Sequence, residues 1–200
     1  MSRPPAGWLA ALRRADRVLF ERLAKAHNPV LDRVMPALSQ AADFSLLWLV
    51  TAGLMAVSGR PGWRRAAGRG LAATAVASLT TNGVAKLAFY RRRPPLDGVP
   101  LVRRVRRVPV TTSFPSGHTA SAAAFATTVA LEAPELGPPV AVLAAGVGLS
   151  RVWTGAHYPG DVLAGAGIGV TVALVLRAFR WRRRWPRWPR RARPGWGSGG

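Results

Sequence analysis

Cysteine is absent from the 200-residue sequence, and acidic residues are scarce, with 8 of them against 29 lysines and arginines. The lack of cysteine excludes disulfides, a thiol nucleophile and thiolate metal ligands. The scarcity of acidic residues gives a formal net charge of +21, a value typical of proteins that bind nucleic acid or anionic lipid. The sequence has no zinc-ligand spacing, helix-turn-helix pattern or aromatic-rich strand motif, so we expect no nucleic-acid partner.

The positive charge comes almost entirely from arginine, with 27 arginines and 2 lysines. These charges collect in blocks between apolar stretches, and 49% of all residues are hydrophobic. Such patterning is typical of a chain that crosses a membrane several times. We therefore predict an all-α fold, a polytopic membrane helical bundle of about five to six membrane helices that contacts an anionic lipid bilayer.

Five apolar segments support this prediction, although several are shorter than the ~17–25 residues that usually span a bilayer. They cover residues 37–58, 71–90, 116–133, 140–153 and 162–179. In the last segment, Gly165, Gly167 and Gly169 favour close packing between helices.

The two ends of the chain differ from this apolar part. Residues 1–7 lack the charged-then-apolar order of a cleavable signal peptide, and residues 7–26 have the periodicity of an amphipathic helix in the membrane interface. A second short amphipathic piece should end at Pro36. We divide the chain into this interfacial region (1–36), a membrane-embedded domain (37–179) and a basic tail (180–200) whose composition predicts disorder.

The order of crossings predicts which segment ends meet. The second segment ends at Arg93, and the third begins at Ser116. The fourth ends near Arg151, and the fifth begins after Asp161. Alternating crossings place these four ends at one face of the membrane, so polar residues distant in the sequence should lie in one layer.

Lys86 and Arg93 form the first cluster with possible chemistry, about two helical turns apart. An arginine such as Arg93 can bind phosphate oxygens in a bidentate manner, whereas Lys86 acts as a point charge. Alternatively, Lys86 extends from a helix end towards water and Arg93 is one of three interfacial arginines.

Ser116, Gly117 and His118 form the second cluster at the start of a predicted helix. Free backbone N–H groups and the helix dipole attract anions there, and Gly117 permits close approach. His118 could donate a proton to a leaving oxygen. The alternative is an ordinary helix start with an interfacial histidine.

Arg151, His157 and Asp161 form the third cluster. Neutral imidazole is a nucleophile, so His157 can attack phosphorus directly. Asp161 can hydrogen-bond the other ring nitrogen and fix its tautomer, and it could also cap the fifth helix. Arg151 adds a third cation for the phosphoryl oxygens.

Through these clusters the chain resembles the type 2 phosphatidic acid phosphatases. The three signatures of that family are Lys-x6-Arg-Pro, Pro-Ser-Gly-His and Ser-Arg-x5-His-x3-Asp. The sequence has all of them complete, at residues 86–94, 115–118 and 150–161. The resemblance is firm over 86–179 and only general elsewhere.

The resemblance implies a metal-independent phosphohydrolase that needs no cofactor and works through a phosphohistidine. His157 would be the nucleophile, Asp161 would orient it, and His118 would protonate the leaving group. The other signature residues would hold the phosphoryl group: Lys86, Arg93, Ser116, Gly117 and Arg151. The substrate would be a lipid phosphate or diphosphate, such as a polyprenyl phosphate or a phosphatidic-acid-like lipid.

Two other functions could use the same residues. A vanadate-dependent haloperoxidase shares the anion site, but those relatives are soluble and larger, which the apolar segments disfavour. A non-catalytic lipid-binding membrane module would lack the nucleophile or its carboxylate, and both are present. We expect a multi-pass protein of the cell membrane with an extracytoplasmic site, because excluding the phosphate-binding Arg93 and Arg151 shifts the positive-inside count towards that orientation.

Overall fold

All regular structure in the computed structural model, which describes residues 6–104 and 111–184, is helical. The α-helices are α1 (Ala6–Lys25), α2 (Pro29–Ala41), α3 (Leu46–Val57), α4 (Pro61–Leu79), α5 (Lys86–Ala88), α6 (Gly117–Glu132), α7 (Gly137–Trp153) and α8 (Pro159–Arg184). Short turns are η1 (Asp43–Ser45), η2 (Thr80–Ala85, π-helical), η3 (Leu101–Arg103) and η4 (Pro134–Leu136). The prediction of an all-α fold is confirmed for this part of the chain.

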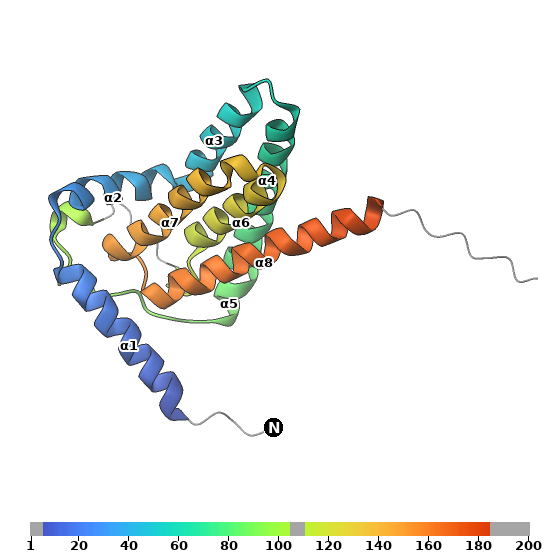
Figure 1. Cartoon of the computed structure of the whole chain (residues 1–200). Coiled ribbons are helices and arrows are strands. Elements are labelled where there is room, and N and C mark those ends of the chain that lie inside the picture. Colours follow the sequence, from blue (N-terminus) through green and yellow to red (C-terminus); the bar gives the residue numbers. More distant parts are fainter. Residues whose placement is uncertain (1–5, 105–110, 185–200) are drawn as a thin grey trace, which may run out of the picture.

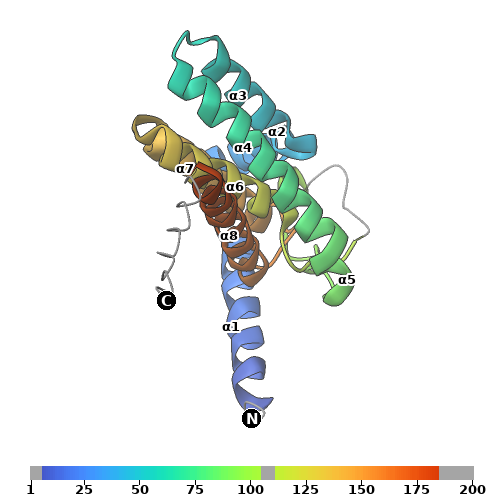
Figure 2. The ribbon, with the colours of Figure 1, turned by 90° about the vertical axis from the view of Figure 1, so that its right-hand side faces the viewer.

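The central helix of the bundle is α6, against which α4, α7 and α8 all pack. Figures 1 and 2 show these helices gathered around it. Its side chains are small or apolar on nearly every side, and most are buried, the pattern of a helix enclosed by other helices. Phe125 of α6 contacts Trp48 of α3 with ring centroids 5.1 Å apart, which extends the core to α3.

Two glycines let α8 approach α6 closely. A Cβ added to Gly165 would lie 2.3 Å from the carbonyl oxygen of Ser116, and one added to Gly169 would lie 2.2 Å from that of Ala120. Real Cβ atoms cannot sit that close to backbone, so only glycine fits at these positions. Gly167 has open space around it, so it takes no part in the close packing that the sequence suggested for all three glycines.

The predicted first span, 37–58, is not one straight helix. Phe44 and Ser45 have φ angles of 52° and 61°, the left-handed region that non-glycine residues seldom adopt. These two residues break the chain between α2 and α3, which meet at 68°. Pro36 also lies inside α2, so the expectation that it ends a short helix was wrong.

The second apolar segment begins earlier than expected. α4 starts at Pro61, a residue suited to the first helical position, after Gly59 with φ of 75°. The predicted start at 71 was wrong, because arginines 64, 65 and 69 lie inside the helix. Arg69 forms an ion pair with Glu132 at the end of α6, and this contact neutralises the charge of an arginine that lies within the helix.

Within the described residues, two helical stretches are long and apolar enough to cross a membrane: Pro134–Trp153 and Pro159–Arg180. The bent pair α2–α3 would add a third if it forms one broken span. The all-helical, membrane-type fold therefore stands, whereas the count of five to six membrane helices stays a prediction.

Helix α1 extends away from the bundle, with its C-terminal half against it (Figures 1 and 2). Phe20 is buried and its ring contacts that of Tyr158, with centroids 5.4 Å apart. Trp8, Leu9 and Leu12 at the other end are exposed. Exposed apolar side chains on this helix suit the interface of a membrane, and that location stays a prediction.

Two helices cross the boundaries of the predicted three-region division. Its boundary at residue 36 falls inside α2, and α8 continues to Arg184, into the segment expected to be disordered. The rest of the predicted tail, 185–200, lies outside the described residues. The division itself stays a prediction.

Replacing Gly169 by alanine should destabilise the protein, because the added methyl would force α8 away from α6. Overpacking of this kind costs about 1–3 kcal/mol, and about 2–4 °C in Tm is expected for each kcal/mol. Gly167→Ala is the matched control, since that position is open. A thermal melt in detergent measures both, and equal Tm values for the two variants would contradict this packing.

Candidate functional site

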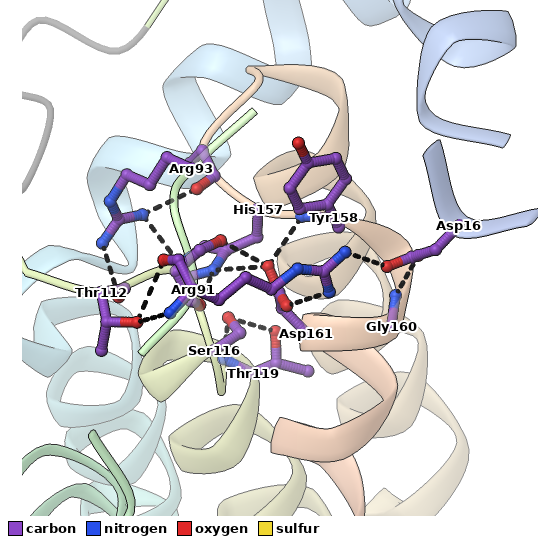
Figure 3. A network of polar contacts seen from close by, with 12 residues as sticks. Asp16, Arg91, Arg93, Thr112, Ser116, Thr119, His157, Tyr158, Gly160 and Asp161 are labelled. Carbon is purple, nitrogen blue, oxygen red and sulfur yellow. Dashed lines mark hydrogen bonds and ion pairs between the residues drawn. The ribbon is translucent and has the colours of Figure 1, made fainter. Parts of the chain in front are cut away.

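His157 lies in the tight loop that joins α7 to α8 and is only 2% exposed. Gly155 turns this loop with φ of 75°. The backbone N–H groups of Ala156 and His157 then donate to the carbonyl oxygen of Arg151, at 3.0 Å each. The loop is thereby folded back onto the end of α7, with the His157 side chain beside Arg93 (Figure 3).

The hydrogen bonds of the His157 ring define its tautomer. Nδ1 is 2.7 Å from the carbonyl oxygen of Ser113, and Nε2 is 3.3 Å from Nη1 of Arg93. A carbonyl can only accept and a guanidinium can only donate. The hydrogen therefore sits on Nδ1, and Nε2 keeps its lone pair.

Burial also keeps the His157 imidazole neutral. It lowers the pKa of His157 to about 4, helped by the positive charges of Arg151 and Arg93 and opposed by Asp161. At neutral pH the ring is uncharged, which is the form that can act as a nucleophile.

Asp161 does not make the expected hydrogen bond to His157. Its Oδ2 is 3.7 Å from Nδ1, too far for a hydrogen bond, because the Ser113 carbonyl already accepts from that nitrogen. The fully buried carboxylate instead accepts from the Ser113 hydroxyl, from Arg91 at 2.7 Å and from the backbone N–H of Tyr158 at 2.9 Å. It therefore orients His157 through Ser113 and also caps the start of α8.

Arg91 links Asp161 to the N-terminal helix. One of its guanidinium nitrogens donates to Asp161, and the other donates to Asp16 of α1 at 2.6 Å (Figure 3). Asp16 also accepts from the backbone N–H of Gly160 at 2.7 Å, and the Arg91 guanidinium lies 4.1 Å from the centroid of the Tyr158 ring. The end of α1 is thus tied to the first turn of α8.

Arg93 and Lys86 meet at Thr111. The Arg93 side chain donates to the carbonyl oxygens of Ala156 and Thr111 at 2.7 and 3.1 Å, which fixes its guanidinium beside His157. Lys86 donates to the Thr111 hydroxyl at 3.3 Å. The two cations that the sequence placed at one helix end therefore face the same threonine.

Ser116 is committed to holding α6 in place. Its hydroxyl contacts the Thr119 hydroxyl at 2.9 Å and accepts from the Thr119 backbone N–H at 3.4 Å. Its own N–H donates to the carbonyl oxygen of Asp161 at 3.0 Å. Gly117 is the first residue of α6, where backbone N–H groups have no partner inside a helix, so it is better placed than Ser116 to contact an anion.

His118 and Arg151 lie beside a carboxylate from η1. Nε2 of His118 is 2.8 Å from Oδ1 of Asp43, and Nη1 of Arg151 is 3.9 Å from the same atom. Arg151 is 2% exposed and donates to the Ser39 hydroxyl. Its Nε is buried without a hydrogen-bond partner in the described part of the chain.

The predicted site residues come together from four segments. The positive charges of Lys86, Arg93 and Arg151 all act on the His118 ring, as expected if the segment ends share one layer. Their roles in catalysis stay predictions. The described residues contain no group of three or more His, Asp or Glu side chains that could hold a metal ion.

Sequence reasoning missed several residues that contact this cluster: Asp16, Ser39, Asp43, Arg91, Thr111 and Ser113. One of them carried a usable signal. Asp43 is the single charged residue within the apolar segment 37–58, and ionisable residues in such segments commonly serve function. The others are ordinary polar residues in loops or helix surfaces, and nothing in their local sequence distinguishes them.

Comparison with known proteins gives a consistent result. Residues 67–185 match the model of the PAP2 superfamily. The chain is 30% identical over 177 residues to decaprenylphosphoryl-5-phosphoribose phosphatase of Mycobacterium tuberculosis, covering 87% of this chain and 91% of that protein. It is 26% identical over 153 residues to undecaprenyl-diphosphatase BcrC of Bacillus subtilis, covering 76% and 77%.

A solved structure is also similar. The transmembrane PAP2 type phosphatidylglycerolphosphate phosphatase from Bacillus subtilis superposes with a TM-score of 0.65 at 26% identity, over 86% of this chain and 87% of that one. The similarity therefore extends beyond the signature residues to the arrangement of the helices.

Replacing Arg91 by glutamine should lower stability and activity together. The buried Asp161 carboxylate would lose its charged partner, and an unsatisfied buried group costs about 1–3 kcal/mol. Arg92→Gln is the matched control, because Arg92 is exposed and its substitution removes the same charge at the neighbouring position. Thermal melts and phosphate release measure both effects, and equal losses in the two variants would show that only net charge matters.

Proposed function

We propose that this chain, which belongs to the PAP2 superfamily, is a membrane phosphatase that hydrolyses a lipid phosphate or diphosphate through a phosphohistidine. The observation that supports this most directly is the tautomer of His157. Its Nε2 lone pair faces a cationic guanidinium, and its Nδ1 hydrogen is held by the Ser113 carbonyl. A ring held in this way can attack a phosphorus atom whose oxygens are bound by that guanidinium.

In the first step, Nε2 of His157 bonds to phosphorus and the bond to the leaving oxygen breaks. His118 gives its proton to that oxygen. The positive charge that develops on His157 is stabilised by the Ser113 carbonyl at 2.7 Å and by the Asp161 carboxylate at 3.7 Å. Asp161 therefore assists by charge and by holding Ser113, rather than by a direct hydrogen bond.

In the second step, water attacks phosphorus and the bond from phosphorus to Nε2 breaks. His118, now neutral, takes the proton of the water, and the enzyme returns to its starting state. Lys86, Arg93 and Arg151 hold the phosphoryl oxygens in both steps, since phosphoryl transfer is catalysed chiefly by positioning and charge stabilisation. Gly117 completes the anion site at the start of α6, and Ser116 holds that helix end in place through Thr119 and Asp161.

A lipid substrate fits the membrane-type fold. The relatives are named for polyprenyl substrates and phosphatidylglycerolphosphate, which share a phosphate group attached to a membrane-embedded chain. We propose a polyprenyl phosphate or diphosphate, or a phosphatidic-acid-like lipid, as the substrate of this chain.

The orientation proposed for the site is extracytoplasmic. His118 and Glu132 lie at opposite ends of α6, about 20 Å apart at 1.5 Å per residue. Arg69 and Arg180 both pair with Glu132, so arginines of α4 and α8 mark the end remote from His118. Positive residues favour the cytoplasmic side, which supports a site on the other face.

The experiment that tests this function is phosphate release from a panel of lipids in detergent. Polyprenyl diphosphate, polyprenyl monophosphate and phosphatidic acid would be compared, with His157→Ala as the inactive variant. We expect turnover to fall by at least about 10³-fold in that variant, and radiolabelled phosphate to be trapped on the wild-type protein after acid-free denaturation. Turnover unchanged by His157→Ala would defeat the nucleophile assignment.

The acid limb of the pH profile of kcat/KM should lie at low pH. His157 has a pKa lowered from 6.5 to about 4, so its neutral, nucleophilic form persists as pH falls through 6 and 5 and is lost only near 4. The profile is measured from pH 3.5 to 8 and corrected for ionisation of the substrate. A limb at the ordinary histidine pKa, after that correction, would contradict the buried environment described for this ring.

A further inference from the structure

We propose that Asp43 is the positioning residue of His118: it accepts the hydrogen on Nε2 and leaves Nδ1 to exchange a proton with the leaving oxygen and with water. The inference rests on the proposed function and assigns a residue outside the three signatures. Its basis is the contact of 2.8 Å between Asp43 Oδ1 and His118 Nε2.

The backbone around Asp43 is bent in an unusual way. Phe44 and Ser45 follow it with φ angles of 52° and 61°, and α2 and α3 diverge there by 68°. Two consecutive non-glycine residues in the left-handed region are unfavourable and persist where the surrounding structure requires them. Here the turn η1 packs against α6 and brings the carboxylate to the first turn of that helix.

The surroundings of His118 oppose protonation of its ring. Burial disfavours a charged ring most, and the positive charges of Arg151 of α7, Lys86 of α5 and Arg93 of the next loop add to this effect. Burial and each of these cations oppose a proton on His118, yet a general acid must carry a proton. Asp43, the carboxylate in contact with the ring at 2.8 Å, is the group whose charge favours that proton.

No other carboxylate in the described part of the chain contacts His118. Asp16 and Asp161 bind Arg91, and Asp32 binds Arg103. Glu132 and Glu135 lie at the far end of α6 and pair with Arg69 and Trp63. Asp43 therefore supplies the negative charge next to this histidine.

The contact also fixes which ring nitrogen reacts. An ionised carboxylate only accepts hydrogen bonds, so Nε2 of His118 carries a hydrogen in both charge states. The proton that moves is then the one on Nδ1: it goes to the leaving oxygen in the first step and returns from water in the second. Asp43 keeps its charge throughout, as a carboxylate that orients a histidine does.

A competing role for Asp43 follows from the same geometry. Oδ1 is also 3.9 Å from Nη1 of Arg151, so the carboxylate could occupy the place of a phosphate oxygen and leave when substrate binds. In that case removing it would tighten anion binding and would not slow the chemistry. The two roles give opposite results.

The test compares two substrates whose leaving groups differ. An alkyl phosphate lipid has a poor leaving group that needs protonation, whereas p-nitrophenyl phosphate leaves without it. Turnover of both is measured for Asp43→Asn and His118→Ala, with Asp97→Asn as the matched control. Asp97 is exposed in the loop before α6, and its substitution by asparagine removes the same negative charge. Vanadate inhibition is measured for every variant.

We expect Asp43→Asn to lower kcat on the alkyl phosphate by about ten- to hundredfold, less than the roughly 10²–10⁴-fold of a general acid itself because His118 remains. On p-nitrophenyl phosphate kcat should change by less than about threefold. The alkaline limb of the alkyl phosphate profile should move to lower pH, because His118 holds its proton less tightly. In the His118→Ala background the Asp43→Asn change should add nothing, the sign of two residues acting as one.

Three results would overturn the inference. Equal kcat on the alkyl phosphate for Asp43→Asn and Asp97→Asn, with that turnover lost in His118→Ala, would refute the role of Asp43 alone. Tighter vanadate inhibition with unchanged kcat would identify Asp43 as an occupant of the anion site. Full activity of His157→Ala on both substrates would refute the proposed function and this inference with it.

Discussion

The geometry around His157 depends on two groups with opposite hydrogen-bonding capacity. The Ser113 carbonyl accepts from one ring nitrogen, and the Arg93 guanidinium donates towards the other. Neither group can exchange its role, so the lone pair of His157 stays on the side where the cations gather. The chain holds both partners in place, Ser113 through the Asp161 carboxylate and Arg93 through backbone carbonyls of neighbouring loops.

The scarcity of acidic residues becomes meaningful in the folded chain. With so many arginines, each buried carboxylate is surrounded by possible partners, and most are used to position one particular cation. Asp161 and Asp16 clamp Arg91 from two helices, and Asp32 holds the fully buried Arg103. These buried pairs fix segments relative to each other more than they add net stability, because desolvation offsets much of their attraction.

The helices around the site were largely predictable, since apolar periodicity and the prolines and glycines at their ends are local features. The expected segments 116–133 and 140–153 correspond to α6 and α7 within a few residues. The break at Phe44 and Ser45 was not predictable, because neither residue favours the left-handed region. The early start of α4 was missed because Arg69, which looks like a loop residue, is neutralised by Glu132 from a distant helix.

The sequence by itself determined the candidate site residues, because three spaced signatures contain the histidines, the carboxylate and the cations that the proposed phosphoryl transfer uses. The predicted alternation of apolar segments also indicated that these groups would meet. Only the tertiary structure decided how they are arranged: that Ser113 rather than Asp161 binds His157, and that Asp43 reaches His118. Such contacts join residues 44 and 75 positions apart, and no local sequence pattern specifies which of several polar groups will contact a ring nitrogen.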